Sequence, residues 1–339
     1  MFKKIDGFDH YVAQGHAATS TATYLNLAGY TLANIATANF AVVPGVDNVG
    51  SALRLTMTAA APNPPTMSYS MTSEQGLIVF GFNFRGTGAR QRVCRINNLI
   101  DLDWDTSTGR LRIAGQQGAN VIIVNAWWYI EVVIDKTAEE VRVYANDTLQ
   151  LTVALPPSVG NTHTITWGLS APAEATGTIE LDDFYALDSD PTDAVNVSRR
   201  GPITVTTRAP TADVEAGWSI VGSQSPNHWE IAAQLDPGRP GAPYLQANID
   251  GRTDKYLSNT VLPNANEIFA VSLVSYARKG DLDDRELGML VETDGGQIEK
   301  RVTLTESFRY HQQIFEQAPG GVAWNQNRVE SSEFGPVAR

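Results

Sequence analysis

The residues best suited to chemistry lie in one short run, Glu180-Leu-Asp-Asp-Phe-Tyr185. Because side chains alternate along a strand, Glu180 and Asp182 point to the same face if this run is extended. Glycoside hydrolysis requires two carboxyl groups about 5–9 Å apart, one acting as the acid and the other as the base or nucleophile. This run is therefore the first place to look for a catalytic pair.

The run resembles the catalytic strand of jelly-roll glucanases, which reads Glu-x-Asp-x-Glu or Glu-x-Asp-x-x-Glu. Glu180 and Asp182 match the first two positions, but Phe184 and Tyr185 occupy both places where the second glutamate could stand. Neither side chain can act as acid or base at a glycosidic bond at neutral pH, since even the tyrosine hydroxyl has a reference pKa of about 10. The sequence therefore predicts no catalytic residue and no enzyme.

Other patterns that could bind a metal or a cofactor are weak. Asp101, Asp103 and Asp105 alternate on one face of an expected strand, where they could hold calcium or form a solvated sheet face, and we favour the solvated face. The segment from Gly45 to Ser51 has the glycine spacing of a phosphate loop, but Ser51 stands where the lysine belongs. We expect no metal site and no cofactor.

The composition excludes several classes of protein. A net charge of −12 and a pI of about 4.9 argue against a nucleic-acid partner, whose binding needs a basic patch. The one cysteine, Cys94, excludes an internal disulfide and a cysteine-rich zinc site, and its strand-like surroundings predict a buried, inert thiol. No apolar run approaches the roughly 18 residues of a membrane span, so we expect no membrane insertion.

Short strands dominate the first half of the sequence. Gly76–Phe84 and Thr178–Leu187 are rich in β-branched and aromatic residues, and turn residues such as those of Asp105–Gly109 separate such runs. Many short strands without amphipathic helices between them predict a mainly β fold, an antiparallel jelly-roll sandwich. The other strands expected here are 90–96, 99–104, 110–113, 121–134, 141–145, 149–153 and 164–169.

Two adjacent tryptophans mark the strand expected to end at Ile134. Alternation places Trp128 on the apolar face with Ile130, whereas Trp127 and Tyr129 share the other face with Glu131. Aromatic side chains on a wet face need a cover, which could be a loop of the same chain, a partner subunit or a sugar ring. Trp127 and Tyr129 are therefore the candidate binding residues.

An Asp/Pro stretch at Asp188–Asp193 divides the chain near residues 190–200. We expect a jelly-roll domain over residues 1–190 and a smaller β-rich domain with little helix over residues 200–339. In the second domain we expect a hairpin turn at Asp294–Gly296 and a short helix over 322–332 that is stopped by Gly335-Pro336. The strands expected there are 203–207, 268–276, 287–292 and 298–305.

The order of three segments carries a family resemblance. Trp127-Trp-Tyr-Ile-Glu-Val132, Val141-Arg-Val-Tyr-Ala-Asn-Asp147 and Ile179–Asp188 together resemble the strands of a concanavalin A-like, or laminin-G-like, jelly roll. With the opening Ile5–Tyr11 and the C-terminal stretch Ile268–Lys279, the layout is similar to that of virion structural proteins of tailed bacteriophages. The resemblance covers most of the chain.

The resemblance implies a non-enzymatic part of a phage particle, most often in the tail, baseplate or fibre. Residues 200–339 would then be the docking and assembly domain, and the partners would be other virion proteins and further copies of the chain, a trimer being one such form. The protein would be assembled in the host cytoplasm and reside in the virion. Two alternatives are a capsid decoration protein and a module that binds a host surface glycan.

Overall fold

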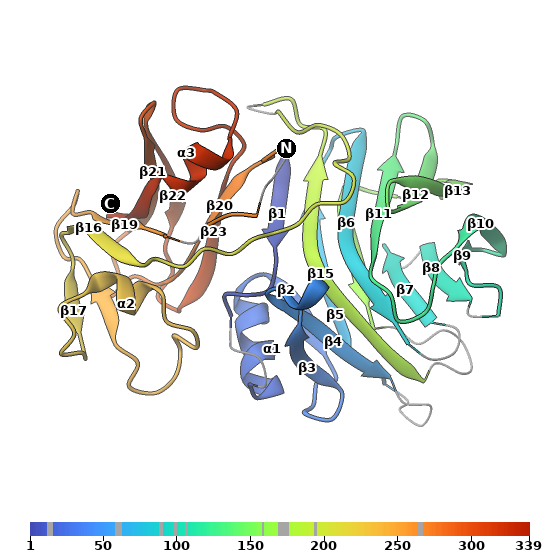
Figure 1. Ribbon diagram of the computed structural model, residues 1–339, viewed down its shortest axis with the longest axis horizontal. Coiled ribbons are helices and arrows are strands. Elements are labelled where there is room, and N and C mark those ends of the chain that lie inside the picture. Colours follow the sequence, from blue (N-terminus) through green and yellow to red (C-terminus); the bar gives the residue numbers. More distant parts are fainter. Residues whose placement is uncertain are drawn as a thin grey trace. The chain divides into compact units, whose positions relative to one another are not determined.

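The computed structural model describes residues 1–11, 16–57, 63–87, 91–97, 100–105, 107–157, 159–168, 176–192, 195–259, 261–263 and 267–339. The chain divides into two compact units, unit 1 (Met1–Val205) and unit 2 (Thr206–Arg339), each of which is built mainly from antiparallel strands (Figure 1). The predicted fold class, mainly β with an antiparallel jelly-roll sandwich and little helix, is confirmed. Among the helices in these ranges, none has the length and apolar character needed to cross a bilayer.

Unit 1 is a sandwich of two sheets, which we call sheets A and B. Helix α1 (Ala18–Leu27) and a 3-10 turn (Val46–Asn48) accompany them. In spatial order, sheet A consists of β13 (Thr148–Ala154), β12 (Glu140–Ala145), β11 (Trp128–Asp135), β6 (Leu77–Gly86), β15 (Gly177–Asp188), β4 (Ser51–Met57) and β3 (Phe40–Pro44), and β1 (Phe2–Asp6) also pairs with β15. Sheet B consists of β10 (Gln116–Val121), β9 (Arg110–Ile113), β8 (Ile100–Asp105), β7 (Gln91–Ile96), β14 (Thr162–Trp167), β5 (Thr66–Thr72) and β2 (Tyr30–Ala33).

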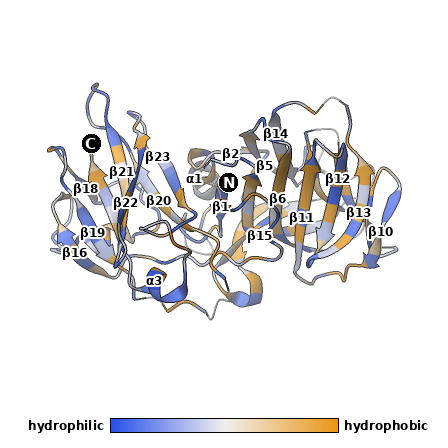
Figure 2. Cartoon of the chain, turned by 90° about the horizontal axis from the view of Figure 1, so that it is seen from above, coloured by the Kyte–Doolittle hydropathy of each residue, from blue (hydrophilic) through white to orange (hydrophobic). Residues whose placement is uncertain are grey.

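The core of unit 1 fills the space between the two sheets. Phe82 of β6 meets Trp167 of β14 edge to face, with ring centroids 5.5 Å apart. Both side chains are buried, and each such burial contributes about 1.5–3 kcal/mol. Strands β6, β11 and β15 are largely coloured as hydrophobic in Figure 2, as expected for central strands. The predicted inert thiol is confirmed, since Cys94 is fully buried and burial raises its pKa.

Unit 2 contains one five-stranded sheet and two separate hairpins. The sheet consists of β16 (Ala212–Ala216), β19 (Asp254–Leu257), β24 (Glu333–Ala338), β21 (Glu286–Thr293) and β22 (Gly296–Thr303). The hairpins pair β17 (Ser219–Val221) with β18 (Tyr244–Gln246) and β20 (Val271–Ala277) with β23 (Arg309–Phe315). Helices α2 (His228–Ala232) and α3 (Gln326–Glu330) complete the unit.

Several boundaries differ from those predicted. The run 121–134 is divided between β10 and β11, because Asn125 adopts a left-handed conformation (φ 59°) that ends an extended segment. The helix predicted over 322–332 is limited to α3. Gly335-Pro336 does not stop a helix but lies inside strand β24, where the fixed backbone angle φ of the proline is compatible with an extended chain. The turn before Gly296 is confirmed, since Thr293 pairs with Gly296 across a two-residue loop.

Candidate functional site

Strand β11 has the predicted alternation but not the predicted wet face. Ile130 pairs with Phe82 and faces sheet B, and Trp128 shares that side while its indole N–H donates to the Ile123 carbonyl at 3.3 Å. Tyr129 and Glu131 point to the outer face of sheet A, yet they are only 3% and 1% exposed. Both faces of this strand are therefore covered.

The cover is a segment of the same chain. Residues 196–205, which we call the strap, run from the end of β15 toward unit 2 across the outer face of sheet A (Figure 1). The strap reaches Glu131 at one end and Asp183 at the other, where the Val205 N–H donates to the Asp183 carboxylate at 2.6 Å. Of the three covers that the sequence left open for Tyr129, the structure has a segment of the same chain: the ring is buried, and its hydroxyl donates to the Asp183 carbonyl at 3.2 Å.

A buried carboxylate fastens the strap to the sheet. Glu131 accepts hydrogen bonds from the backbone N–H groups of Arg200 (3.2 Å) and Gly201 (2.9 Å) and from the Tyr185 hydroxyl. Its second oxygen accepts from the Arg199 guanidinium at 2.7 Å, which also pairs with Asp147 at 2.6 Å. A buried carboxylate with this many donors is stabilised where it stands, so Glu131 holds the strap rather than taking part in catalysis.

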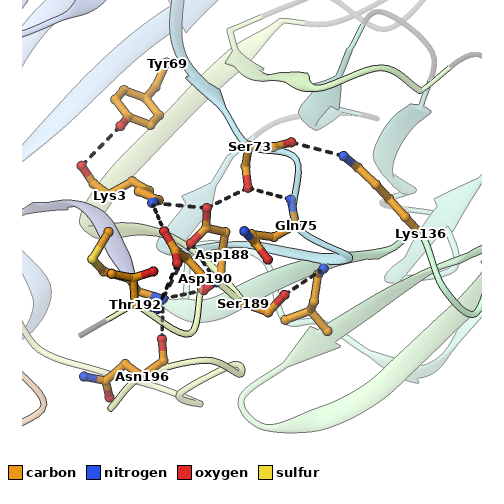
Figure 3. A network of polar contacts seen from close by, with 12 residues as sticks. Lys3, Tyr69, Ser73, Gln75, Lys136, Asp188, Ser189, Asp190, Thr192 and Asn196 are labelled. Atoms are coloured by element: carbon orange, nitrogen blue, oxygen red, sulfur yellow. Dashed lines mark hydrogen bonds and ion pairs between the residues drawn. The ribbon is translucent and has the colours of Figure 1, made fainter. Parts of the chain in front are cut away.

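A second polar network, around Asp188, holds the segment between the end of β15 and the strap (Figure 3). Asp188 accepts from the Ser73 hydroxyl at 2.6 Å and forms an ion pair with Lys3 at 3.2 Å, and Lys3 also pairs with Asp190 at 3.5 Å. The Asp/Pro stretch is therefore not a free linker at its start. Because the strap also packs on sheet A, unit 1 extends to Val205, beyond the predicted boundary near 190–200.

A β-bulge in β15 brings two carboxyl groups together beside the strap. The register with β6 shifts between Asp182 and Tyr185, and Asp183 adopts φ 49°. Burial, followed by the charge of Asp183, raises the pKa of Asp182 to about 8, although the Val46 and Asp183 N–H groups donate to it. Burial likewise raises the pKa of Asp183 to about 6. Both carboxyls are tied to backbone amides, so they stabilise local structure.

Glu180 is equally occupied. The guanidinium groups of Arg54 and Arg85 flank its carboxylate from the two neighbouring strands, with the Arg54 Nη2 atom 2.6 Å from one oxygen. Neither of the two positions where the glucanase pattern has its second glutamate carries a carboxyl group: Phe184 packs edge to face on Trp167 at 5.2 Å, and Tyr185 points to Glu131. The two arginines occupy the carboxylate of Glu180, and the carboxyl of Asp182 on the same face is held by the N–H groups of Val46 and Asp183.

Trp127 is the one candidate binding residue that keeps an accessible surface. It is half-buried, and the Arg85 guanidinium carbon lies 4.7 Å from the centroid of its ring. This distance is within the range of a cation–π interaction. The structure thus separates the two candidates, leaving Trp127 open and covering Tyr129 with the strap.

The aspartates of β8 face arginines of adjacent strands. Asp101 pairs with Arg95 at 2.5 Å, Asp103 with Arg92 at 3.1 Å and Asp105 with Arg112 at 3.6 Å. These ion pairs provide the positive charge that a calcium ion would otherwise supply. Within the described ranges, no group of three or more His, Cys, Asp or Glu side chains is arranged to hold a metal ion.

Sequence reasoning missed Glu131 and its partners in the strap. The boundary predicted near residues 190–200 separates Arg199-Arg-Gly from the jelly roll, and the alternation assigns Glu131 to a wet face. The sequence did indicate that this face is covered, because it carries Tyr129 and Val133 beside Glu131, and valine is more often buried than exposed to water. The pattern indicated a cover but not which segment supplies it.

No protein-family model matches the sequence, and no curated protein matches it. Solved structures are similar at the level of the fold. An alginate lyase of polysaccharide lyase family 7 is 15% identical over 48% of this chain and 95% of its own, with a TM-score of 0.36. A glycosyl hydrolase family protein from Mycobacterium fortuitum is 11% identical over 55% of this chain and all of its own (TM-score 0.36).

A third similar structure is domain 4 of an extracellular arabinanase from Geobacillus stearothermophilus, solved in complex with arabinotriose. It is 12% identical over 46% of this chain and 81% of its own, with a TM-score of 0.34. At these identities and scores the likeness concerns the β fold alone and assigns no activity to this chain.

Proposed function

We propose that this protein is a non-enzymatic structural component of a phage particle, placed in the tail, baseplate or fibre, and that unit 2 assembles it with its neighbours. The virion setting comes from the resemblance of the sequence segments described above. The absence of catalysis is supported by Glu180, which two arginines neutralise, and by Asp182, which two backbone amides hold.

The observation that carries the assembly role is the small core of unit 2. Of the described residues, forty-nine buried apolar side chains belong to unit 1, but only eleven belong to unit 2. Meanwhile Val261 and Leu282 of unit 2 are 76% and 84% exposed, and no residue of strand β20 is fully buried. A unit with so little core gains stability when its apolar surface is covered by further copies of the same chain.

Strand β20 indicates where such a contact forms. Val271 and Leu273 pack on the core of unit 2, whereas the opposite face of the hairpin carries the exposed Val274 with Tyr276 and Tyr310. Aromatic residues are enriched at protein interfaces, and the charges of this hairpin lie near its end, at Arg309. Subunit contacts on this face would complete the unit.

Three measurements test the proposal. Sedimentation of the full chain should give a homo-oligomer, and Val274→Glu should shift it toward the monomer, whereas Val49→Glu in unit 1 should not. Mass spectrometry of purified particles should find the protein in stoichiometric amount, and its position by electron microscopy would separate a tail from a capsid location. A monomer at all concentrations, or turnover of a polysaccharide abolished by Glu180→Gln, would refute the proposal.

A further inference from the structure

Four side chains form one row across the outer face of sheet A. Arg54 of β4 pairs in register with Glu180 of β15, which pairs in register with Arg85 of β6. Trp127 immediately precedes Trp128, the partner of Phe84, so its ring lies beside Arg85. The row therefore reads arginine, glutamate and arginine over three neighbouring strands, followed by the tryptophan that precedes β11.

The ion pairs leave half of each guanidinium unused. Arg54 directs Nε and Nη2 to one oxygen of Glu180, and Arg85 directs the same two atoms to the other oxygen. In the described part of the chain, neither Nη1 atom has a hydrogen-bond partner. Two cations against one anion give this row a charge of +1 on a protein of −12, with N–H donors remaining for a second carboxylate.

The strap covers the neighbouring row of side chains on this face but leaves the row of Arg54, Glu180, Arg85 and Trp127 partly exposed to solvent. One row further in, Tyr129 and Asp182 are buried, whereas the side chains of Arg54 and Arg85 are 40% and 27% exposed. Burial holds the neighbouring carboxyl of Asp182 largely in its neutral form at pH 7, since its pKa rises to about 8. An anion approaching the arginines therefore meets little repulsion from that side.

We propose that this row, Arg54–Glu180–Arg85–Trp127, binds a saccharide that carries a carboxylate, such as a uronic acid unit. The carboxylate accepts hydrogen bonds from the free guanidinium N–H groups, and the apolar face of the sugar ring lies against the exposed part of Trp127. The inference is separate from the assembly role, because it concerns unit 1 alone.

The surroundings favour a sugar over an acidic peptide. The next row outward is polar but uncharged, since the hydroxyl groups of Thr87 and Thr178 hydrogen-bond to each other at 2.8 Å. A peptide that binds as an added strand would need a free sheet edge. Strands β4, β15 and β6 offer none, because each is paired on both sides: β4 with β3 and β15, β15 with β4 and β6, and β6 with β15 and β11.

The test is calorimetric titration of the full chain with a galacturonic acid hexamer. Maltohexaose serves as the neutral control and a hexaglutamate peptide as the acidic peptide control. The variants are Arg54→Gln, Arg85→Gln and Trp127→Ala. Arg142→Gln is the matched control, since Arg142 lies on the same sheet face, is 29% exposed and pairs with Asp135 and Glu140 without contacting the row.

We expect the uronic acid hexamer to bind at least about tenfold more tightly than maltohexaose. Arg54→Gln and Arg85→Gln should each weaken its binding by about tenfold, the value of one charge-assisted hydrogen bond, and Trp127→Ala should weaken it by removing the apolar contact with the sugar ring. Arg142→Gln should bind as the unsubstituted protein does. Thermal unfolding identifies any variant that fails to fold. If Arg85→Gln or Trp127→Ala does not fold, the binding measured with Arg54→Gln decides the test, because the Arg54 side chain is more exposed than that of Arg85. The proposal is overturned if the uronic acid does not bind at millimolar concentration, if maltohexaose or hexaglutamate binds as well, or if Arg142→Gln weakens binding equally.

Discussion

Replacing Glu131 by glutamine should detach the strap from sheet A. The substitution keeps the size of the side chain but removes the charge that Arg199 and the Arg200 and Gly201 amides meet. An amide offers one acceptor oxygen instead of two, so at least one of these donors loses its partner in a site that is 1% exposed.

The expected loss of stability follows from these contacts. Removing one partner of a buried ion pair costs about 3–5 kcal/mol, and a hydrogen bond to a charged group contributes about 1.5–3 kcal/mol. Arg199 is 27% exposed and retains Asp147, so its own cost is small and the lower limit applies. We expect Glu131→Gln to lower the free energy of unfolding by about 3 kcal/mol.

Urea unfolding followed by circular dichroism measures this difference, and hydrogen exchange measures the protection of the Arg200 and Gly201 amides. The control is Glu140→Gln. Glu140 pairs with Arg142 at 3.2 Å, both residues lie in β12, next to β11, and the Glu140 side chain is 31% exposed. That control should cost no more than about 1 kcal/mol. If Glu131→Gln is as mild as the control, or if the two amides remain fully protected, the carboxylate does not hold the strap.

Three further outcomes are expected. Gly81→Ala should destabilise unit 1 by about 1–3 kcal/mol in denaturant unfolding, because the added methyl group would overlap the ring of Tyr185; an unchanged midpoint would mean that the ring moves freely. Tyr129→Phe should cost about 1 kcal/mol by losing its hydrogen bond to the Asp183 carbonyl, and should leave saccharide binding unchanged. Asp182 has a folded pKa above its unfolded value of about 3.9, so the folded state retains a proton that the unfolded state releases, and stability should fall as pH rises from about 4 to about 8. Asp182→Asn should flatten that slope in unfolding curves measured across this pH range, and an unchanged slope would assign it to other groups.

The sequence is sufficient for most strands between residues 76 and 187, whereas the strand predicted over 203–207 is absent and residues 203–205 belong to the strap. Alternation places Ile130 and Trp127 on opposite faces, and in the structure Ile130 is buried in the core whereas Trp127, the residue before β11, lies against Arg85. This succeeds because the side-chain period of a strand is a local property of the backbone. Likewise, Phe184 and Tyr185 exclude a glucanase-type pair wherever the strand lies, because neither side chain is a carboxylic acid.

Local pattern fails where a segment distant in the chain supplies the environment. Glu131 and its strap partners are separated by about seventy residues, and nothing in the period of β11 indicates that the strap returns to cover Tyr129. The same holds for the row at Trp127: Arg54 and Glu180 lie 126 positions apart and meet only because β4 pairs with β15. The sequence determined which residues share a face, whereas only the tertiary structure decided which faces are covered and which charges meet, because strand pairing and chain crossing depend on contacts that no local pattern encodes.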